Sequence, residues 1–332
     1  MFEAFAEGVA DAWPETAAVL RRAAYDALVL SLMPDEPTWD IPHRLVAAAR
    51  WLALAGQADD FEAANDPWGT FRAVVAEHRE WAAAFVREQP VQTNVVQRCF
   101  ALLPLLLTVA RDTERPLDLL ELGTSSGLNL MLDHHRYRYR AGTWGHGEGL
   151  ELTGEERTPV PAGLLATPVE VRRRAGVDLQ PVDATTEEGL RLLCSFVHAG
   201  PGRTLLREAA ATLRLDPPQL VRGDYLALLP ALLAGRDDAA LTVVFQTLSS
   251  VYLSDAGRAR LRAIVDAAGE EGPLAWISTP TPEEHGQRRG DYPLEVAVWP
   301  GGERRIVARM DVRGEWLDWT SELGRSARQS RR

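Results

Sequence analysis

Residues 117–132, LDLLELGTSSGLNLML, decide the fold that this sequence predicts. The apolar run 117–122 is typical of a buried strand, and the small residues after it lead into an apolar segment that we expect to be a helix. Gly123 and Gly127 permit a tight turn and a close approach of the backbone to a ligand. We therefore predict a strand, a loop and a helix whose first free N–H groups bind a polar or anionic ligand.

Short apolar runs alternate with helical stretches in the C-terminal part of the chain. The runs that we expect to be strands are 117–122, 169–172, 219–221, 241–246, 274–278, 294–299 and 305–310. Helical segments separate the first five runs, as in a parallel sheet, whereas the turn 300–302 joins the last two as an antiparallel hairpin. The pattern predicts an α/β fold of five parallel strands with a C-terminal antiparallel hairpin.

The N-terminal part has the spacing of helices, with prolines between the segments. The helical segments that we expect are 17–32, 45–54, 71–85 and 95–109. We predict a helical region over residues 1–115, an α/β domain over 116–320 and a mobile, arginine-rich tail over 321–332.

Charge and composition exclude several classes of function. The net charge of −11 argues against a nucleic acid or a membrane surface as partner. All 36 basic residues are Arg, so a Schiff-base lysine, a pyridoxal-phosphate lysine and a phosphate-loop lysine are excluded. Two distant cysteines, Cys99 and Cys194, form neither a disulfide framework nor a zinc cage, and the start of the chain lacks a secretory signal. We expect a cytoplasmic protein without a membrane anchor.

The loop after the first strand resembles the first motif of class I S-adenosylmethionine-dependent methyltransferases, in which an acidic residue precedes a glycine-rich turn. Glu121 is that acidic residue, and Ser125 stands where the motif has its middle glycine. The resemblance implies a Rossmann-like methyltransferase core with S-adenosylmethionine as the cofactor. In such enzymes, acidic positions comparable to Asp178, Asp183 and Asp224 hold the ribose and the adenine. The residues assigned to cofactor binding are Glu121, Gly123, Ser125, Ser126, Gly127, Asp183 and Asp224.

A longer resemblance extends over most of the chain. Residues 121–139, ELGTSSGLNLMLDHHRYRY, together with the upstream Gln92, Asn94 and Arg98, are similar to an uncharacterised bacterial family with a methyltransferase-like domain. Val95 stands where that family has an acidic residue after its asparagine.

Polar residues after the loop suggest acid–base chemistry. On a helix, Asn129, Asp133 and Tyr137 share one face, which we expect to point toward the ligand; a solvated face is the alternative. Asp133 can deprotonate an amine or hydroxyl, and His134 can carry a proton near neutral pH. We assign catalysis to Asp133, His134 and Gln246, of which Gln246 follows the fourth strand. We assign substrate binding to Asn94, Arg98, Asn129, Tyr137 and Tyr252.

Two neighbouring segments complete the expected pocket. Residues 133–140 carry five potential cations, which suit an anionic substrate or leaving group. We expect residues 281–285 to form a further wall, and the alternative is a solvated charge pair in a loop. We expect no metal site, because adjacent histidines such as His134 and His135 point apart on a helix and no carboxylate–histidine spacing supports His146 as a ligand.

Three functions fit these observations. The first is methyl transfer from S-adenosylmethionine to a small molecule, such as a natural-product intermediate. The second is a cofactor-independent substitution or elimination, in which an amine closes a ring and displaces sulfate or phosphate. The third is a non-catalytic binding partner of a small protein or of a second copy of the chain.

Overall fold

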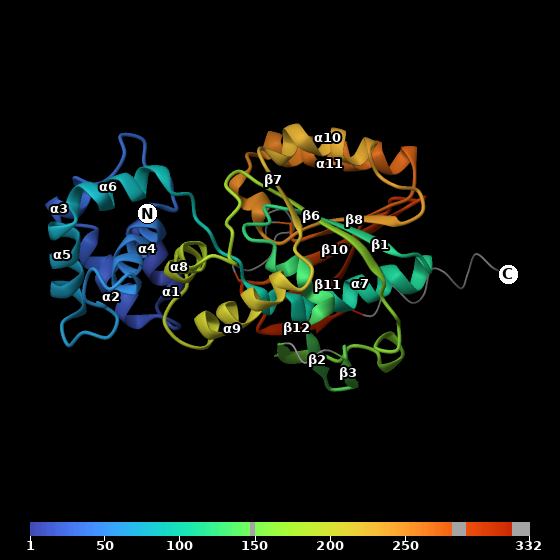
Figure 1. Cartoon of the computed structure of the whole chain (residues 1–332), viewed down its shortest axis with the longest axis horizontal. Coiled ribbons are helices and arrows are strands. Elements are labelled where there is room, and N and C mark those ends of the chain that lie inside the picture. The colour runs from blue at the N-terminus through green and yellow to red at the C-terminus, as the bar shows by residue number, and fades with distance from the viewer. Residues whose placement is uncertain (147–149, 281–289, 321–332) are drawn as a thin grey trace. The chain divides into compact units, whose positions relative to one another are not determined.

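The computed structural model describes residues 1–146, 150–280 and 290–320, and it divides the chain into two compact units (Figure 1). The helical unit contains Met1–Thr93 and Val182–Arg207, and the sheet unit contains Asn94–Pro181 and Glu208–Arg332. This division differs from the predicted boundary after residue 115. A helix that we placed in the helical region belongs to the sheet unit, and a later segment returns to the helical unit.

The helical unit is built from short amphipathic helices. Proline begins several of them, because its fixed φ suits the first turn and its missing N–H costs nothing there. The helices are α1 (Phe2–Val9), α2 (Pro14–Ala23), α3 (Ala27–Leu30), α4 (Ile41–Leu54), α5 (Pro67–Glu77), α6 (Arg79–Glu88) and α8 (Glu187–Ser195). The apolar faces of α1 to α6 meet in one core around Leu20, Phe61 and Phe71, all fully buried, and α8 packs against α4.

A buried ion pair lies within this core. Arg50 Nη2 donates to Glu62 Oε1 at 2.6 Å, and both side chains are almost completely buried. Thr16 Oγ1 donates to the same carboxylate oxygen at 2.7 Å. The guanidinium of Arg203, a residue from the returning segment, lies 3.9 Å from the other carboxylate oxygen. The pairing explains how a core of helices accommodates charges that are otherwise costly to bury.

The sheet unit has a mixed α/β fold with a large, mostly parallel sheet. Within the described residues this sheet has nine strands in the order β5-β12-β11-β10-β9-β8-β1-β6-β7. The strands are β1 (Leu117–Leu122), β5 (Glu155–Thr158), β6 (Val171–Asp178), β7 (Gln219–Arg222), β8 (Leu241–Gln246), β9 (Leu274–Ser278), β10 (Tyr292–Trp299), β11 (Arg305–Met310) and β12 (Trp316–Trp319).

The first five predicted strands lie next to one another and run parallel, from β7 through β6, β1 and β8 to β9. The next two, β10 and β11, pair in an antiparallel manner, as the turn between them predicts. The predicted α/β class is therefore confirmed. Strands β5 and β12, which we did not predict, extend the sheet beyond the hairpin.

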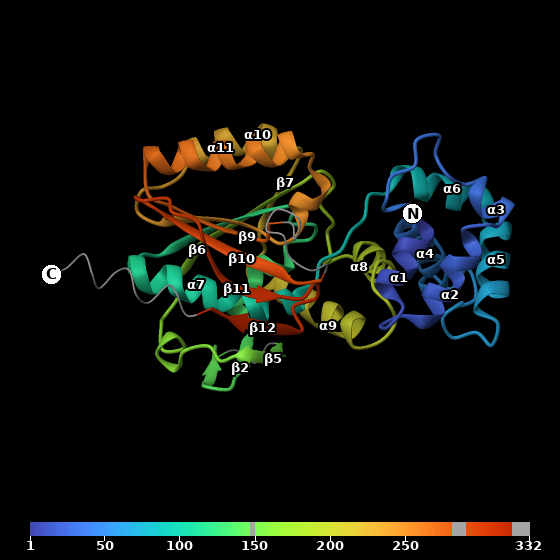
Figure 2. The ribbon, with the colours of Figure 1, turned by 180° about the vertical axis from the view of Figure 1, so that it is seen from behind.

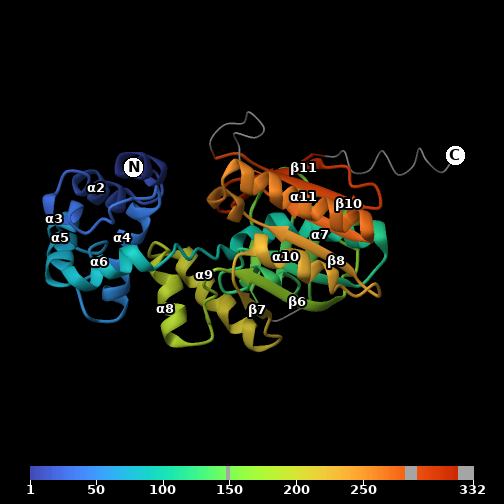
Figure 3. The same cartoon turned by 90° about the horizontal axis from the view of Figure 1, so that it is seen from above.

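Helices cover both faces of this sheet. On one face, α10 (Tyr225–Ala234) and α11 (Asp255–Glu271) pack against strand residues such as Val244 and Trp276, and Figure 3 shows both helices lying over the strands. On the other face, α7 (Cys99–Thr113) contacts β11 and β12 (Figure 2). Nearly every residue of α7 is buried, so it is a core helix of the sheet unit. Helix α9 (Pro201–Ala210) crosses the division between the two units.

The helix predicted after the glycine loop is not present. A short 3₁₀ helix, η2 (Leu128–His134), takes its place, and the chain then becomes the strand β2 (Arg136–Tyr139). Strand β2 lies between β3 (Gly142–Trp144) and β4 (Glu151–Thr153) in a small three-stranded sheet. The residues of β2 alternate between exposed arginine and buried tyrosine, which is the period of a strand with one buried face. The helical prediction is therefore wrong for this stretch.

Several predictions fall outside the described residues, namely those on the 281–285 wall and the 321–332 tail. Among the described helices, none has both the length and the apolar character needed to span a membrane.

Candidate functional site

Glu121 is the residue before the last of β1 and is 2% exposed. Its carboxylate accepts a hydrogen bond from Thr124 Oγ1 at 2.7 Å and another from Asn129 Nδ2 at 3.2 Å. Burial raises the pKa of Glu121 to about 8, although these two hydrogen bonds act in the opposite direction. The carboxyl group therefore gains or loses its proton near neutral pH, as acid–base groups at functional sites do.

The loop between Glu121 and η2 is closely packed. Gly123 has φ 71°, and a Cβ atom placed there would lie 2.3 Å from Cβ of Ser249. Gly127 has φ 78°, and its Cβ would lie 2.8 Å from Cγ of Pro218. Ser125 also adopts a left-handed conformation, with φ 54°. The glycines are thus required for close approach, as predicted, but the groups that approach are side chains of the protein.

The N–H groups of this loop already have partners. The backbone N–H groups of Gly123 and Thr124 donate to the carbonyl oxygen of Val177 at 2.8 and 3.2 Å. That of Ser125 donates to Oδ2 of Asp178 at 2.8 Å. These loop N–H groups are therefore bonded within the protein, whereas the prediction of free N–H groups concerned the start of the helical segment that follows.

The side chain of Asn94 lies at the start of η2, where we expected a ligand to bind. Its Oδ1 accepts from the backbone N–H of Leu128 at 3.0 Å and from Oγ of Ser126 at 2.7 Å. Asn94 is 3% exposed. A buried amide that caps a loop stabilises it, so this predicted substrate-binding residue has a structural contact to explain its presence.

Arg98 is buried and connects three segments at the carboxyl end of the sheet. Its Nε donates to the carbonyl of Val312 at 2.8 Å and its Nη1 to that of Thr247 at 3.3 Å. Burial lowers the pKa of Arg98 to about 10, while Tyr252 and Glu121, among others, act to raise it. Arg98 thus interacts electrostatically with both Glu121 and the half-exposed Tyr252.

Asp133 is held in an ion pair. Its two carboxylate oxygens accept from Nη1 and Nη2 of Arg174 at 2.9 and 2.8 Å. Arg174 lies on β6 with its side chain 5% exposed, and its Nε also donates to Asp216 at 2.7 Å. His134 Nε2 lies 3.2 Å from the same guanidinium. A carboxylate whose two oxygens are both bonded to a guanidinium is fixed in place, so the contacts favour a structural role for Asp133.

The predicted face of Asn129, Asp133 and Tyr137 does not exist, because these residues lie on a 3₁₀ helix and a strand. Asn129 contacts Glu121, Asp133 contacts Arg174, and the buried Tyr137 donates its hydroxyl to the carbonyl of Leu132 at 2.6 Å. Asn129 and Tyr137 both lie next to Cys99, whereas the carboxylate of Asp133 is bonded to Arg174.

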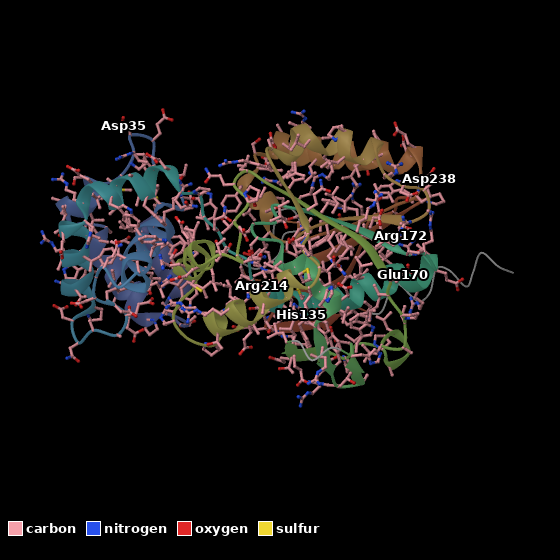
Figure 4. The ribbon with its side chains drawn as sticks, viewed as in Figure 1. Asp35, His135, Glu170, Arg172, Arg214 and Asp238 are labelled. Carbon is pink, nitrogen blue, oxygen red and sulfur yellow. The ribbon has the colours of Figure 1, made fainter. Side chains whose placement is uncertain are left out.

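His135 is fully buried, and neither ring nitrogen has a hydrogen-bond partner in the described part of the chain (Figure 4). Burial lowers the pKa of His135 to about 4, and the neighbouring His134 adds to this effect. The imidazole is therefore neutral at physiological pH. Within the described ranges, no three His, Cys, Asp or Glu side chains lie close enough to hold a metal ion.

The cations of residues 136–140 do not gather around Asp133. Arg136 and Arg138 both pair with Glu151 on β4, with Arg136 Nη2 at 2.7 Å from the carboxylate. They project from the exposed face of β2. The strand period directs Arg136 and Arg138 to the exposed face, where they pair with Glu151, so these two predicted cations lie apart from the carboxylate of Asp133.

The three aspartates that we compared with the ribose and adenine positions lie in different places. Asp183 belongs to the helical unit, where its Oδ1 accepts from the backbone N–H of Thr185 at 2.9 Å. Asp224 is the N-cap of α10 and accepts from the backbone N–H of Leu226 at 2.8 Å. Asp178 ends β6, next to β1, so it is the aspartate that lies beside the glycine loop.

The carboxyl ends of β6 and β7 combine charge with an exposed apolar group. Asp178 lies opposite Arg222 in the backbone register of the two strands, and Asp224 follows β7. Leu179 directly follows Asp178 and is 64% exposed, although leucine is usually buried. Figure 4 labels Glu170 and Arg172, which lie near the opposite end of β6. An exposed apolar side chain next to a carboxylate suits a ligand that has both a flat ring and hydroxyl or amine donors.

A cavity of about 310 Å³ lies at the carboxyl ends of β8 and β9. Gln246, the last residue of β8, lines this cavity. Its side-chain amide also donates to Oγ of Ser250 and to the carbonyl of Thr279, each at 3.2 Å. Ser278 and Glu295, which we did not predict, line the same cavity. Glu295 lies in the interior of β10 rather than after a strand, so position in the sequence does not mark it.

Comparison with known proteins identifies the family but not its activity. A family model described as "Uncharacterized protein conserved in bacteria (DUF2332)" matches residues 1–319. The chain belongs to this family. This membership agrees with the predicted resemblance to an uncharacterised bacterial family. A search of curated proteins found no match.

Among solved structures, the DUF2332 chain is similar to one titled "High resolution (2.2 A) crystal structure of WbdD". The two sequences are 13% identical, and the match covers 60% of this chain and 36% of the other, with a TM-score of 0.30. The match thus spans about a third of that protein, and so slight a likeness indicates neither a shared fold nor a shared function.

Proposed function

We propose that the chain is a methyltransferase-like enzyme that acts on a small molecule and binds the nucleoside part of S-adenosylmethionine at the carboxyl ends of β6 and β7. The observation that carries this proposal is the position of Asp178. Its carboxylate ends the strand next to β1 and receives the backbone N–H of Ser125 from the glycine loop. An acid and a glycine loop thus meet where doubly wound sheets bind nucleotides.

The order of the parallel strands supports the same location. Numbered along the chain, the five predicted parallel strands are arranged 3-2-1-4-5 across the sheet. In this arrangement the connections from the central strand leave in opposite directions, and ligands bind outside the carboxyl ends of the strands near that point. We infer a Rossmann-like core from this order together with the strand, loop and acidic residue at Glu121.

The described residues fit the nucleoside part of S-adenosylmethionine better than its amino acid part. Asp178 can accept hydrogen bonds from ribose hydroxyls, since a carboxylate that already accepts two bonds retains further lone pairs. Leu179 offers an apolar surface to the adenine ring, and Asp224 lies one strand away for its amine. The amino acid part has no row of free loop N–H groups to bind it. When bound, the cofactor supplies an electrophilic methyl group.

A titration of the full chain with S-adenosylmethionine and with S-adenosylhomocysteine, followed by calorimetry, tests this proposal. Leu179→Ala should weaken the binding of both ligands about fivefold, because an exposed leucine that becomes covered by a ligand contributes on the order of 1 kcal/mol. Leu215→Ala is the matched control, since Leu215 is 71% exposed, lies in the same unit and precedes β7. No heat with either ligand, or equal losses in both variants, would contradict the proposal.

A second candidate is a substitution or elimination without a cofactor. It is favoured by the loop N–H groups of Gly123, Thr124 and Ser125, which are already bonded within the protein. Because Asp133 is held by Arg174, the base in such a reaction would be another group. Native mass spectrometry of protein purified from its own host separates the possibilities, since it shows a bound nucleoside, a partner chain of the non-catalytic alternative, or neither.

A further inference from the structure

The cavity at the carboxyl ends of β8 and β9 is lined by one row of the sheet. Gln246 is paired with Ser278, and Ser278 is paired with Glu295 on the adjacent strand β10. Paired residues on neighbouring strands project to the same face, so the three polar side chains stand side by side. All three line the cavity.

Apolar groups form the rest of the inner wall. Trp276 lies two residues before Ser278 on β9, hence on the same face, and it is 3% exposed. Leu261 of α11 and Pro280 also line the cavity. A volume of about 310 Å³ is at the small end of the range for ligand pockets, so the space suits a molecule with a single ring.

Two arginines of α11 line the same cavity. Arg258 donates to the carbonyl of Leu253 at 2.6 Å and also bonds Asp255, so it fastens the start of the helix. Arg262 follows one turn later on the same side of the helix and also lines the cavity. A guanidinium matches the geometry of a carboxylate, which it can bind through two parallel hydrogen bonds.

The carboxylate already in the wall has its own cationic neighbour. Glu295 accepts from Oγ of Ser278 at 3.3 Å and lies 3.5 Å from Nε of Arg304. Together with Gln246 and Ser278, it presents hydrogen-bond acceptors to the inside of the cavity. A ligand that fits this wall therefore has a hydroxyl or amine donor on its inner side.

We propose that this cavity binds a small aromatic carboxylate, with its ring against Trp276, its hydroxyl or amine at the row of Gln246, Ser278 and Glu295, and its carboxylate at Arg262. The cavity lies on the face covered by α11, and the proposal does not require binding of S-adenosylmethionine. If the cofactor does bind at β6 and β7, this cavity is a site for a second molecule.

Calorimetric titration of the full chain with 4-hydroxybenzoate tests the proposal, with 4-hydroxybenzamide as the uncharged partner probe. Arg262→Met should weaken binding of the carboxylate about tenfold and leave binding of the amide unchanged, because only the carboxylate forms a charge-assisted bond with the arginine. Arg260→Met is the matched control, since Arg260 is an exposed arginine of the same helix that does not line the cavity.

A second variant tests the location independently of charge. Ser278→Leu places a larger side chain into the row of polar residues and should abolish binding of both probes, while thermal unfolding shows whether the fold is retained. The proposal is overturned if the unmodified chain binds neither probe, if Arg262→Met binds 4-hydroxybenzoate as tightly as the unmodified chain, or if a folded Ser278→Leu variant still binds both probes. Leu179→Ala should leave 4-hydroxybenzoate binding unchanged, because Leu179 does not line this cavity. The variant therefore separates a failure of the cofactor site from a failure of this cavity.

Discussion

Glu121 and Asp133 are carboxylic acids at the two ends of one segment, and the structure gives them opposite surroundings. Glu121 accepts hydrogen bonds from the uncharged side chains of Thr124 and Asn129, and burial raises its pKa to about 8. Asp133 is engaged through both oxygens by the guanidinium of Arg174.

The difference shows that the partner of a carboxylate decides what the carboxylate can do. Glu121 is a buried acid without a bonded cation and exchanges its proton near neutral pH, whereas Asp133 forms a two-point ion pair that joins η2 to β6. The sequence suggests acid–base chemistry at Asp133, but the contacts favour Glu121 as the group that titrates. Three substitutions test this contrast.

The largest effect is expected from Arg174→Met. The variant leaves Asp133 without its partner and removes the bond to Asp216, so the free energy of unfolding of the sheet unit should fall by about 3 kcal/mol. Chemical denaturation followed by circular dichroism measures this change. Arg173→Met, an exposed neighbour on the same strand, should change stability by less than about 0.5 kcal/mol. Equal stability of the two variants would show that the ion pair does not contribute to the free energy of unfolding.

An intermediate effect is expected from Glu121→Gln, and it depends on pH. The pKa of Glu121 is about 8 in the folded chain and 4.5 as an ordinary value, so between these values the folded chain holds one proton more than the unfolded chain. Stability therefore falls as the pH rises through this window, and the neutral amide removes that loss. At pH 9 the variant should be more stable than the unmodified chain, and near pH 5 the two should be nearly equal.

Calorimetric melting temperatures from pH 5 to pH 9 measure this difference. The matched control is Asp133→Asn, which should not show a gain in stability as the pH rises. Parallel curves for the unmodified chain and Glu121→Gln would contradict a raised pKa at this position.

The smallest effect is expected from Tyr137→Phe, at the third position of the predicted helical face. Loss of the buried bond from its hydroxyl to the carbonyl of Leu132 should cost about 1 kcal/mol. Tyr25→Phe, at a tyrosine that is 76% exposed, should cost less than about 0.5 kcal/mol. A neutral Tyr137→Phe variant would contradict the hydrogen bond to Leu132. If Asp133→Asn and Asn129→Asp also changed ligand binding together, the result would favour the single face predicted from the sequence.

Local patterns in the sequence determined the backbone of the parallel sheet well. The predicted strands 117–122, 241–246, 274–278 and 305–310 have the same bounds as β1, β8, β9 and β11. Apolar runs that end at glycine, proline or polar turns carry this information, because the preference of a strand for such residues acts between near neighbours. The alternation of arginine and tyrosine in 136–139 is equally local, and counting its period of two would have predicted β2.

Tertiary structure alone decided which side chains meet. Arg174 reaches Asp133 from β6, the bond between Ser125 and Asp178 joins two strand ends, and Ser249 fills the space beside Gly123. Each of these contacts joins positions far apart along the chain, so no spacing in the sequence records it. Whether an acid is paired, neutral or open to a ligand depends on burial and on the nearest charge, and both are set by packing across the strands.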